Sequence, residues 1–433
     1  MKSVYVAMSA DFIHSAHLGV LEKAKEMGSV TVGILSEKAI VTYKRLPLLS
    51  VDERVQIASN LKNVSHVVVQ EDVDPTSMLR ELKPDYVVHG DDWIEGPQSH
   101  IRALVVNVIS EWGGRLVEVP YTVSMTGLGK KNMIRQTGST AEWRLSSLRR
   151  LIRAKDLVRI IEVHNGLCGL IAESVSVEIN GERREFDGMW ESSLTDSTSK
   201  GKPDTSAVDV TSRTSTIDQI LEVTHKPMIV DADNGGLTEH FCFNVRTLER
   251  LGVSAVIIED KVGPKRNSLF GQDAGQQQDS IKEFSYKISQ GKKAQVTPHF
   301  MIFARVESLI LGQGQKDAME RARAYVKAGA DGIMIHSKEK STDEIMEFTR
   351  NFREFSLDIP IAVVPSTYAA VYEKELIAAG INIVIYANHL LRAAFPAMIR
   401  TAEEILKNER CLEAAEENCM SIKEILTLIP ESV

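Results

Sequence analysis

The sequence has few cysteines, few aromatic residues and no excess of positive charge. Its four cysteines are scattered through 433 residues and show neither a CxxC pair nor zinc-ligand spacing, so we expect reduced thiols in a cytoplasmic protein. Aromatic residues make up 6% of the chain, the net charge is −8, and no basic stripe is interleaved with aromatics. These absences argue against nucleic acid as the main partner.

Long apolar runs are also missing. No stretch approaches the roughly 20 residues that cross a membrane, so we expect no membrane partner. The short apolar run at the N-terminus contains Asp11, which favours a strand over a signal peptide. The apolar share of 43% and the charged share of 25% are ordinary for a soluble globular protein, and a chain of this length is expected to form two domains.

The first part of the chain alternates short β-branched segments with amphipathic helical patterns. The strand-like segments are SVYVAMSAD, SVTVGILS, SHVVVQED, PDYVVHGDD and RLVEVPYT. This rhythm predicts a parallel α/β sheet of the nucleotide-binding, Rossmann-like type over residues 1–130. A stretch rich in Gly, Ser, Lys and Arg then breaks the pattern, so we place a linker at 131–143 and a second domain at 144–433.

Eight apolar runs follow, most of them separated by helical patterns. They are RIIEVHN, FDGMWESS, KPMIVDAD, SAVIIED, FMIFARVES, DGIMIHSK, IPIAVVPS and NIVIYANH. Such a series predicts a (β/α)₈ TIM barrel. Nearly every run ends in a polar side chain, and because the carboxyl ends of barrel strands share one rim, these side chains are expected to meet there. They are Trp190, Ser192, Asp231, Asp233, Glu259, Arg305, His336, Ser366 and Asn388.

Four carboxylates are candidates for a metal site at this rim: Asp204, Asp231, Asp233 and Glu259. Carboxylates packed closely raise one another's pKa, and a hard divalent cation relieves the repulsion. Oxygen ligands with no His or Cys beside them favour Mg²⁺ or Mn²⁺. The alternative is an ordinary set of strand-end and helix-cap acids.

Basic and polar groups accompany the carboxylates. Arg305 suits a carboxylate or phosphate, with an ion pair to Glu307 as the alternative. His336 could hydrogen-bond a transferring group or be a satisfied core histidine. Lys265 and Asn267 lie in the loop of IIEDKVGPKRNSLFG, which suits closure over an anion, although such a loop could also be a solvated charge run.

From about residue 144 to the C-terminus the chain resembles phosphoenolpyruvate phosphomutase, a member of the isocitrate lyase superfamily. The resemblance rests on FDGMWESSL, GKPD, VDADNG, EDKVGPKRNS, ARVES, HSK, VPSTY and YANHLLRA. It implies that Asp231 contacts Mg²⁺ directly, with the other three carboxylates acting through water. It implies that Trp190 and Ser192 hold the pyruvate enolate. The groups that it places around the phosphoryl group are Lys265, Asn267, Arg305 and His336.

The EDK…NS loop discriminates among related reactions. It lacks the catalytic cysteine expected of a carbon–carbon lyase, and Asn267 stands where a phosphonopyruvate hydrolase is expected to have a different residue. A mutase is therefore favoured, with the hydrolase as the near alternative. Ser193 and Gly263 replace a glycine and an aromatic residue of the family pattern, which bears on the rate more than on the reaction.

The segment ADFIHSAHLGVLEKAKEMG resembles the HxGH motif of cytidylyltransferase-like nucleotidyltransferases, with Ala16 in place of the glycine. YKRLPLLSVDER and VVHGDDW resemble the segments that carry the family's lysine and a nucleotide-binding turn, and YTVSMT is a weak echo of its late signature, without the arginine. The resemblance implies a CTP site in which Asp11, Lys44, Gly90, Asp91 and Asp92 bind the nucleotide. In this site His14 and His17 are catalytic and stabilise the charge on the attacked α-phosphate. Either the domain transfers CMP, or it keeps the fold with the activity weakened or lost.

The pairing of the two domains is similar to the fused enzymes of phosphonate antibiotic pathways such as fosfomycin biosynthesis. It implies that the barrel interconverts phosphoenolpyruvate and phosphonopyruvate and that the first domain transfers CMP from CTP to a small phosphonate, 2-hydroxyethylphosphonate by analogy. Family members form dimers or tetramers in which barrels exchange their last helix. The apolar segment RAAFPAMIRTAEEILKN after the last strand is compatible with such a homo-oligomer.

Overall fold

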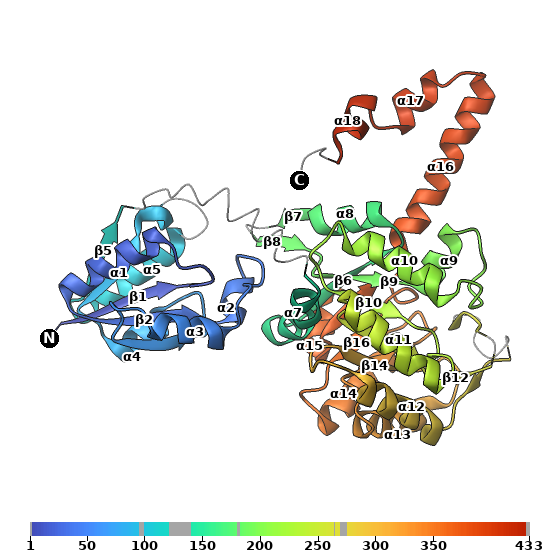
Figure 1. Cartoon of the computed structure of the whole chain (residues 1–433), viewed down its shortest axis with the longest axis horizontal. Coiled ribbons are helices and arrows are strands. Elements are labelled where there is room, and N and C mark those ends of the chain that lie inside the picture. The colour runs from blue at the N-terminus through green and yellow to red at the C-terminus, as the bar shows by residue number, and fades with distance from the viewer. Residues whose placement is uncertain are drawn as a thin grey trace.

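Separate hydrophobic cores divide the chain into two domains. The structure is a computed structural model and describes residues 2–94, 99–120, 140–179, 182–263, 265–268 and 275–429. One pair of buried clusters lies entirely in the first domain and another pair lies in the barrel. Figure 1 shows the two domains side by side, with the C-terminal helices projecting from the second. The predicted linker at 131–143 falls mostly outside the described residues.

The first domain is a five-stranded parallel sheet in the order β3-β2-β1-β4-β5, with helices on both faces. All five predicted strands are present, and the Rossmann-like fold is confirmed. The sheet order reverses between β1 and β4, and such a reversal opens a crevice at the carboxyl ends of those two strands. The strands are β1 (Ser3–Met8), β2 (Ser29–Leu35), β3 (His66–Gln70), β4 (Tyr86–Gly90) and β5 (Arg115–Val119). The helices are α1 (Ser15–Met27), α2 (Glu37–Val41), α3 (Val51–Ser59), α4 (Thr76–Leu82), the 3₁₀ turn η1 (Asp91–Trp93) and α5 (Ser99–Ser110).

The second domain is a closed parallel barrel in the order β10-β11-β14-β15-β16-β17-β6-β9, which confirms the predicted TIM barrel. Side chains alternate strictly along each strand: Ala255 and Ile257 of β11 face the barrel interior, whereas Val256 and Ile258 pack against the surrounding helices. Both faces are thus apolar, as a fully covered parallel sheet requires. The strands are β6 (Val158–Val163), β9 (Gly188–Glu191), β10 (Met228–Asp231), β11 (Ala255–Glu259), β14 (Met301–Val306), β15 (Gly332–Ile335), β16 (Ile361–Val363) and β17 (Ile383–Tyr386).

Helices surround the barrel. Two short hairpins, which the sequence did not predict, are added to it. The hairpins are β7 (Ser176–Ile179) with β8 (Glu182–Glu185), and β12 (Lys261–Val262) with β13 (Gln277–Gln278). The helices are α7 (Ala141–Ala154), α8 (Gly166–Ser174), α9 (Ser193–Ser199), α10 (Val210–Leu221), α11 (Thr238–Leu251), α12 (Ile281–Ala294), α13 (Gly314–Lys327), α14 (Asp343–Phe355) and α15 (Glu373–Ala379).

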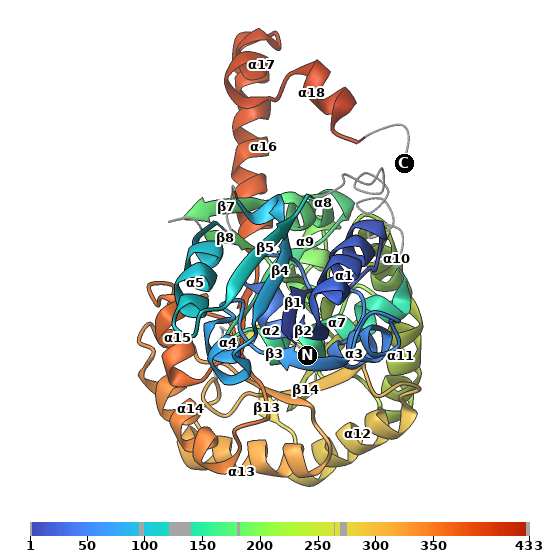
Figure 2. The same cartoon turned by 90° about the vertical axis from the view of Figure 1, so that its left-hand side faces the viewer.

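Three C-terminal helices form an arm that leaves the barrel, as Figures 1 and 2 show. They are α16 (His389–Asn408), α17 (Leu412–Asn418) and α18 (Ile422–Thr427). No residue of α16 is buried, although the helix carries large apolar side chains such as Phe395 and Leu406. Within the part of the chain that the structure describes, no helix combines the length and the hydropathy needed to cross a membrane.

The first domain contacts the end of the barrel at which the strands begin. Helix α2 packs against α7, and Leu46 packs on the core cluster inside the barrel. Arg45 donates hydrogen bonds to Glu173 and Glu185, at 2.5 and 3.3 Å. A cleft of about 420 Å³ lies between the two domains, lined on the barrel side by residues that precede β6, β9 and β10.

Candidate active sites

One cavity at the carboxyl rim of the barrel collects nearly all the residues predicted for this domain. Its volume is about 80 Å³. Predicted residues that line it are Trp190, Ser192, Asp204, Asp231, Glu259, Lys265, Asn267, Arg305, His336, Ser366 and Asn388. Asp233 does not line the cavity, but its carboxylate forms an ion pair with Lys265, which does.

The pleat of the strands explains why these side chains point inward. Glu259 has the same parity as Ala255 and Ile257, which face the barrel interior. Arg305 likewise follows Met301 and Phe303 in the interior register. The same spacing relates Asp231 to Ile229 and His336 to Met334. Because successive side chains of a strand point to opposite faces, each inward register ends in a group at the rim.

Lys265 lies among the carboxylates as their counter-ion. Its Nζ is 2.6 Å from Asp204 Oδ1 and also donates to Asp233 and to the hydroxyl of Ser193. Ser193 in turn donates to Asp231 Oδ2 at 2.9 Å. Burial lowers the pKa of Lys265, but the three aspartates outweigh burial and raise it above its ordinary value. Burial raises the pKa of Asp231, but Lys265 and then Arg305 bring it below its ordinary value.

These oxygen donors fit a hard divalent cation. Asp204 and Asp233 converge on one positive group, the ammonium of Lys265, and carboxylate oxygens are the ligands that a hard divalent cation prefers. Among the residues that the structure describes, no three His, Cys, Asp or Glu side chains lie close enough to share one ion.

Arg305 joins a buried network at the far side of the cavity. Its Nε donates to Glu307 Oε1 at 2.5 Å and its Nη2 donates to Ser268 Oγ at 2.6 Å. Its Nη1 is 3.6 Å from Glu259 Oε2. The ion pair with Glu307, which the sequence left as an alternative to a role in the site, is therefore present in a residue that also lines the cavity.

His336 lies beside this arginine, which favours the neutral form of its ring. Arg305 Nη2 lies 2.9 Å from His336 Nδ1, and because a guanidinium only donates, Nδ1 is the acceptor. Burial, followed by Arg305, lowers the pKa of His336. The proton of the neutral ring therefore resides on Nε2, which makes the histidine a hydrogen-bond donor through that nitrogen.

Sequence reasoning missed several residues that set the charge of the rim. Ser268 connects the loop to Arg305 and Glu307, and it was visible in the motif NS. The buried pair of Glu191 and Arg213 also escaped it. Burial raises the pKa of Glu191 to about 7 despite Arg213. Arg213 lies within the amphipathic helix α10, where no local signal distinguishes it from a surface arginine.

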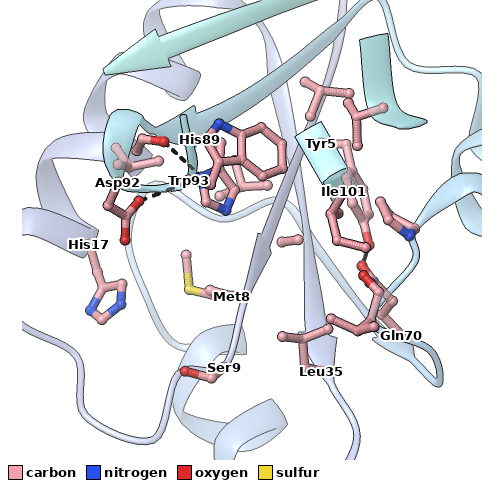
Figure 3. Close-up of a pocket in the computed structure, with 18 of the residues that line it drawn as sticks. Tyr5, Met8, Ser9, His17, Leu35, Gln70, His89, Asp92, Trp93 and Ile101 are labelled. Carbon is pink, nitrogen blue, oxygen red and sulfur yellow. Dashed lines mark hydrogen bonds and ion pairs between the residues drawn. The ribbon is translucent and has the colours of Figure 1, made fainter. Parts of the chain in front are cut away.

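A second cavity, of about 140 Å³, lies in the crevice between β1 and β4 of the first domain. His17, Lys44, Gly90 and Asp92 line it, as predicted. Figure 3 shows His17 and Asp92 at one end, on the same side as Met8. Three residues predicted for the CTP site do not line this cavity: Asp11, His14 and Asp91.

The three residues that do not line the cavity lie close to it in the sequence but make other contacts. His14 is the N-cap of α1, and its ring lies 4.0 Å from that of His17, centroid to centroid. Asp11 accepts a hydrogen bond from the backbone N–H of Leu49 at 3.0 Å. Asp91 begins η1 and precedes the cavity-lining Asp92. The segment YTVSMT, residues 121–126, lies outside the described residues.

A stacked aromatic pair, which the sequence analysis did not single out, forms one wall of this cavity (Figure 3). The rings of His89 and Trp93 are 3.7 Å apart and inclined by 11°. His89 Nδ1 lies 2.8 Å from the carbonyl of Gly90, and burial lowers the pKa of His89. Trp93 donates to Glu118 at 2.9 Å, which fixes its ring. The motif VVHGDDW contained both aromatic residues.

Backbone strain marks both sites. Ala10 in the first domain and Asp233 in the barrel have φ values of 52° and 54°, a region that costs a non-glycine residue about 1–2 kcal/mol. Each follows the strand that carries its site, β1 or β10. Strained residues of this kind cluster where the backbone must present groups to a ligand.

The comparisons with known proteins agree with this geometry. Residues 148–406 match the family described as phosphoenolpyruvate phosphomutase, and residues 9–119 match the family described as cytidylyltransferase-like. Phosphoenolpyruvate phosphomutase of Tetrahymena pyriformis is 35% identical over 65% of this chain and 90% of its own length.

Solved structures extend the likeness. The crystal structure of phosphoenolpyruvate phosphomutase from Streptomyces platensis subsp. rosaceus is 36% identical, with a TM-score of 0.60 over 66% of this chain and 94% of that one. A phosphonopyruvate hydrolase in complex with oxalate and Mg²⁺ is 31% identical, with a TM-score of 0.58 over the same shares.

The closed parallel barrel and its charged rim define an enzyme of the phosphoenolpyruvate mutase and isocitrate lyase type. More narrowly, the chain belongs to the phosphoenolpyruvate phosphomutase family and carries a cytidylyltransferase-like domain before the barrel.

Proposed function

We propose that the protein is a bifunctional enzyme of phosphonate biosynthesis whose barrel interconverts phosphoenolpyruvate and phosphonopyruvate. The observation that carries this proposal is the single rim cavity shared by Asp231, Arg305 and His336 and walled by Lys265 and Asn267. Phosphoryl transfer requires mainly positioning and charge stabilisation, and these groups supply both.

Each group has a role in this reaction. Arg305, His336 and Lys265, together with Asn267, contact the phosphoryl group as it moves between the enol oxygen and C3. Trp190 and Ser192 hold the carboxylate edge of the pyruvate part. Asp231 directly, and Asp204, Asp233 and Glu259 through water, would hold Mg²⁺, which would supply positive charge beside the enolate oxygen. The loop that carries Lys265 and Asn267 keeps water from the phosphoryl group.

The mutase and the hydrolase are distinguished by following phosphonopyruvate with ³¹P NMR in the presence of Mg²⁺. The mutase predicts that phosphoenolpyruvate accumulates, because the equilibrium should lie in that direction. Free phosphate and pyruvate, with no phosphoenolpyruvate, would instead identify a phosphonopyruvate hydrolase, the activity of a relative that shares the barrel.

We propose further that the first domain transfers CMP from CTP to a small phosphonate, 2-hydroxyethylphosphonate by analogy with the fosfomycin pathway. An oxygen of the phosphonate attacks the α-phosphorus of CTP, and the bond to the leaving pyrophosphate breaks. His17 and Lys44 line the cavity and supply positive or hydrogen-bonding groups for the phosphates. The stacked His89 and Trp93 give a flat wall on which a base could lie.

The second candidate is a mutase whose first domain binds a ligand without turnover. Ala16 in place of the motif's glycine favours it, because its methyl group lines the cavity. The test is pyrophosphate release from CTP with Mg²⁺ and 2-hydroxyethylphosphonate. Release establishes the transferase, whereas no release with any small phosphonate would establish the second candidate.

We also infer a homo-oligomer, dimer or tetramer, in which α16 packs on a second copy of the chain. The exposed apolar side chains of the arm support this inference. The four cysteines are free thiols, which supports the cytoplasmic location expected from the sequence.

A further inference from the structure

The loop that carries Lys44 is held to the barrel domain by Arg150, in addition to the contacts that Arg45 and Leu46 make with the barrel. Arg150 lies on α7, and its guanidinium donates to Glu37 Oε1 at 2.6 and 2.8 Å. The same group donates to the backbone carbonyls of Pro47 at 2.8 Å, Leu48 at 3.2 Å and Leu49 at 3.2 Å. Arg150 thus contacts both ends of the segment 37–49, with Lys44 between them.

Further contacts fix the arginine itself. The ring of Trp143, two turns earlier on the same face of α7, lies 5.2 Å from its guanidinium carbon. Leu148 and Leu151, on either side of Arg150 in the sequence, pack in the barrel core and fix the helix. The Arg150 side chain is only 14% exposed, so its hydrogen bonds are shielded from water.

Hydrogen bonds connect the segment 37–49 to residues at the nucleotide cavity. Both backbone polar groups of Leu49 are hydrogen-bonded. Its N–H donates to Asp11 at 3.0 Å, and its carbonyl accepts from Arg54 at 3.1 Å as well as from Arg150. Arg54 is fully buried and donates at 2.8 Å to the carbonyl of Ser9, which lines the cavity. The strained Ala10 lies between Ser9 and Asp11.

We propose that Arg150 of the barrel domain is a positioning residue for the nucleotide site of the first domain, so that the site is fully formed only when the barrel is attached. The proposal rests on the proposed CTP site. A planar fork with five N–H donors is needed to reach a carboxylate and consecutive carbonyls together, and lysine cannot reproduce it.

The test uses the full-length chain with Arg150→Ala, Arg150→Lys and the control Arg149→Ala. Arg149 is the neighbouring residue on α7, but its guanidinium donates to Asp331 within the barrel at 2.9 Å instead. CTP affinity is measured by isothermal titration calorimetry, and mutase activity on the same samples shows that the barrel is folded.

We expect Arg150→Ala to weaken CTP binding about tenfold or more, because several buried charge-assisted hydrogen bonds are lost. Arg150→Lys should give a smaller loss, and Arg149→Ala should remain within about twofold of the wild type. Mutase activity should stay within about twofold in all three. Wild-type CTP affinity in folded Arg150→Ala would overturn the proposal. If Arg150→Ala does not fold, Arg150→Lys decides in the same way.

Hydrogen exchange of the ligand-free chain separates this proposal from the proposed transferase. Loss of the anchorage should accelerate exchange about five- to tenfold in the peptide covering residues 44–50, and Arg149→Ala should leave it unchanged. A wild-type chain that binds no CTP would refute the nucleotide site, while this measurement would still decide the role of Arg150. Unchanged exchange in Arg150→Ala and Arg150→Lys would refute it.

Discussion

Lys265 shows how a residue far along the chain balances the charge of the rim. Its ammonium group draws together Asp204, Asp233 and Ser193, and Ser193 connects it to Asp231. Several carboxylates in a buried cavity repel one another, so a positive group among them lowers the free energy of the folded state. The hydroxyl of Ser193, where the family pattern has glycine, is part of this balance.

Asp231→Ala should abolish mutase activity and leave CMP transfer intact. The proposed direct ligand of Mg²⁺ is removed, and we expect the mutase rate to fall by at least about 100-fold. The first domain contributes no residue to this cavity, so pyrophosphate release from CTP should stay within about twofold. Parallel ³¹P NMR and pyrophosphate assays check both expectations.

The matched control is Asp218→Ala on the outer helix α10, which should change neither activity. Loss of both activities in a folded Asp231→Ala variant would contradict the separation of the two sites.

His164 gives the barrel a pH-dependent contribution to stability. Burial lowers the pKa of His164, but hydrogen bonds to Cys168 and Glu162 outweigh burial and raise it to about 9. The Nδ1 atom lies 2.5 Å from Glu162 Oε1. Because the folded pKa exceeds the unfolded value of about 6.5, this stabilisation is complete below pH 6.5 and is lost as the pH rises towards 9.

We therefore expect the free energy of unfolding to fall by about 1–2 kcal/mol between pH 6.5 and 9 because of this histidine. Urea denaturation at several pH values measures it. Glu162→Gln should reduce the slope, since the charge partner of the imidazolium is gone. A slope identical in wild type and His164→Asn would show that another group is responsible.

At the scale of the element, the α16 helix is stable only if something covers it. It has a Pro396 in its second turn and no buried residue, yet it runs for twenty residues. Most of the stability of a helix in a protein comes from the packing of its apolar face, and apolar side chains on an uncovered helix are costly to expose. A second copy of the chain supplies the covering surface in our proposal.

Phe395→Glu should weaken the oligomer, because it places a charge in the apolar face of α16. The side chain is 61% exposed in the single chain, so the substitution should not disturb the barrel itself. Light scattering after size exclusion should show a smaller species with unchanged circular dichroism. Glu403→Gln, an exposed polar change on the same helix, is the control and should leave the mass unaltered. An unaltered mass for Phe395→Glu would argue against a role for this face.

At the scale of the whole molecule, the two candidate sites lie in different domains and serve different proposed reactions. The first domain contacts the barrel where its strands begin, whereas the mutase cavity opens at the carboxyl ends of the same strands. The two cavities share no lining residue in the part of the chain that the structure describes. This suits two reactions that are not consecutive.

The separate cores predict that ligands stabilise the domains separately. CTP at 100 times its Kd should add about 2.7 kcal/mol to the first domain, and Mg²⁺ with oxalate should stabilise only the barrel. Differential scanning calorimetry should resolve two transitions, each shifted by one ligand. Asp231→Ala should cancel the shift caused by Mg²⁺ with oxalate. A single transition raised equally by both ligands would show that the domains unfold as one unit.

The sequence alone determined the strands of the two main sheets and the polar groups that meet at the barrel rim. Apolar runs are local, so those ending in Glu259 or Arg305 predict both a strand and the polar side chain at its end. The motifs then predicted most of the groups that meet in each cavity.

Only the tertiary structure decided which charges are neighbours. Arg213 beside Glu191, Lys265 among the aspartates and Arg150 against the carbonyls of Pro47–Leu49 join residues that are distant in sequence. It also placed His14 and Asp11 outside the nucleotide cavity. Coulombic and hydrogen-bond energies depend on separation in space, which no periodicity along the chain encodes.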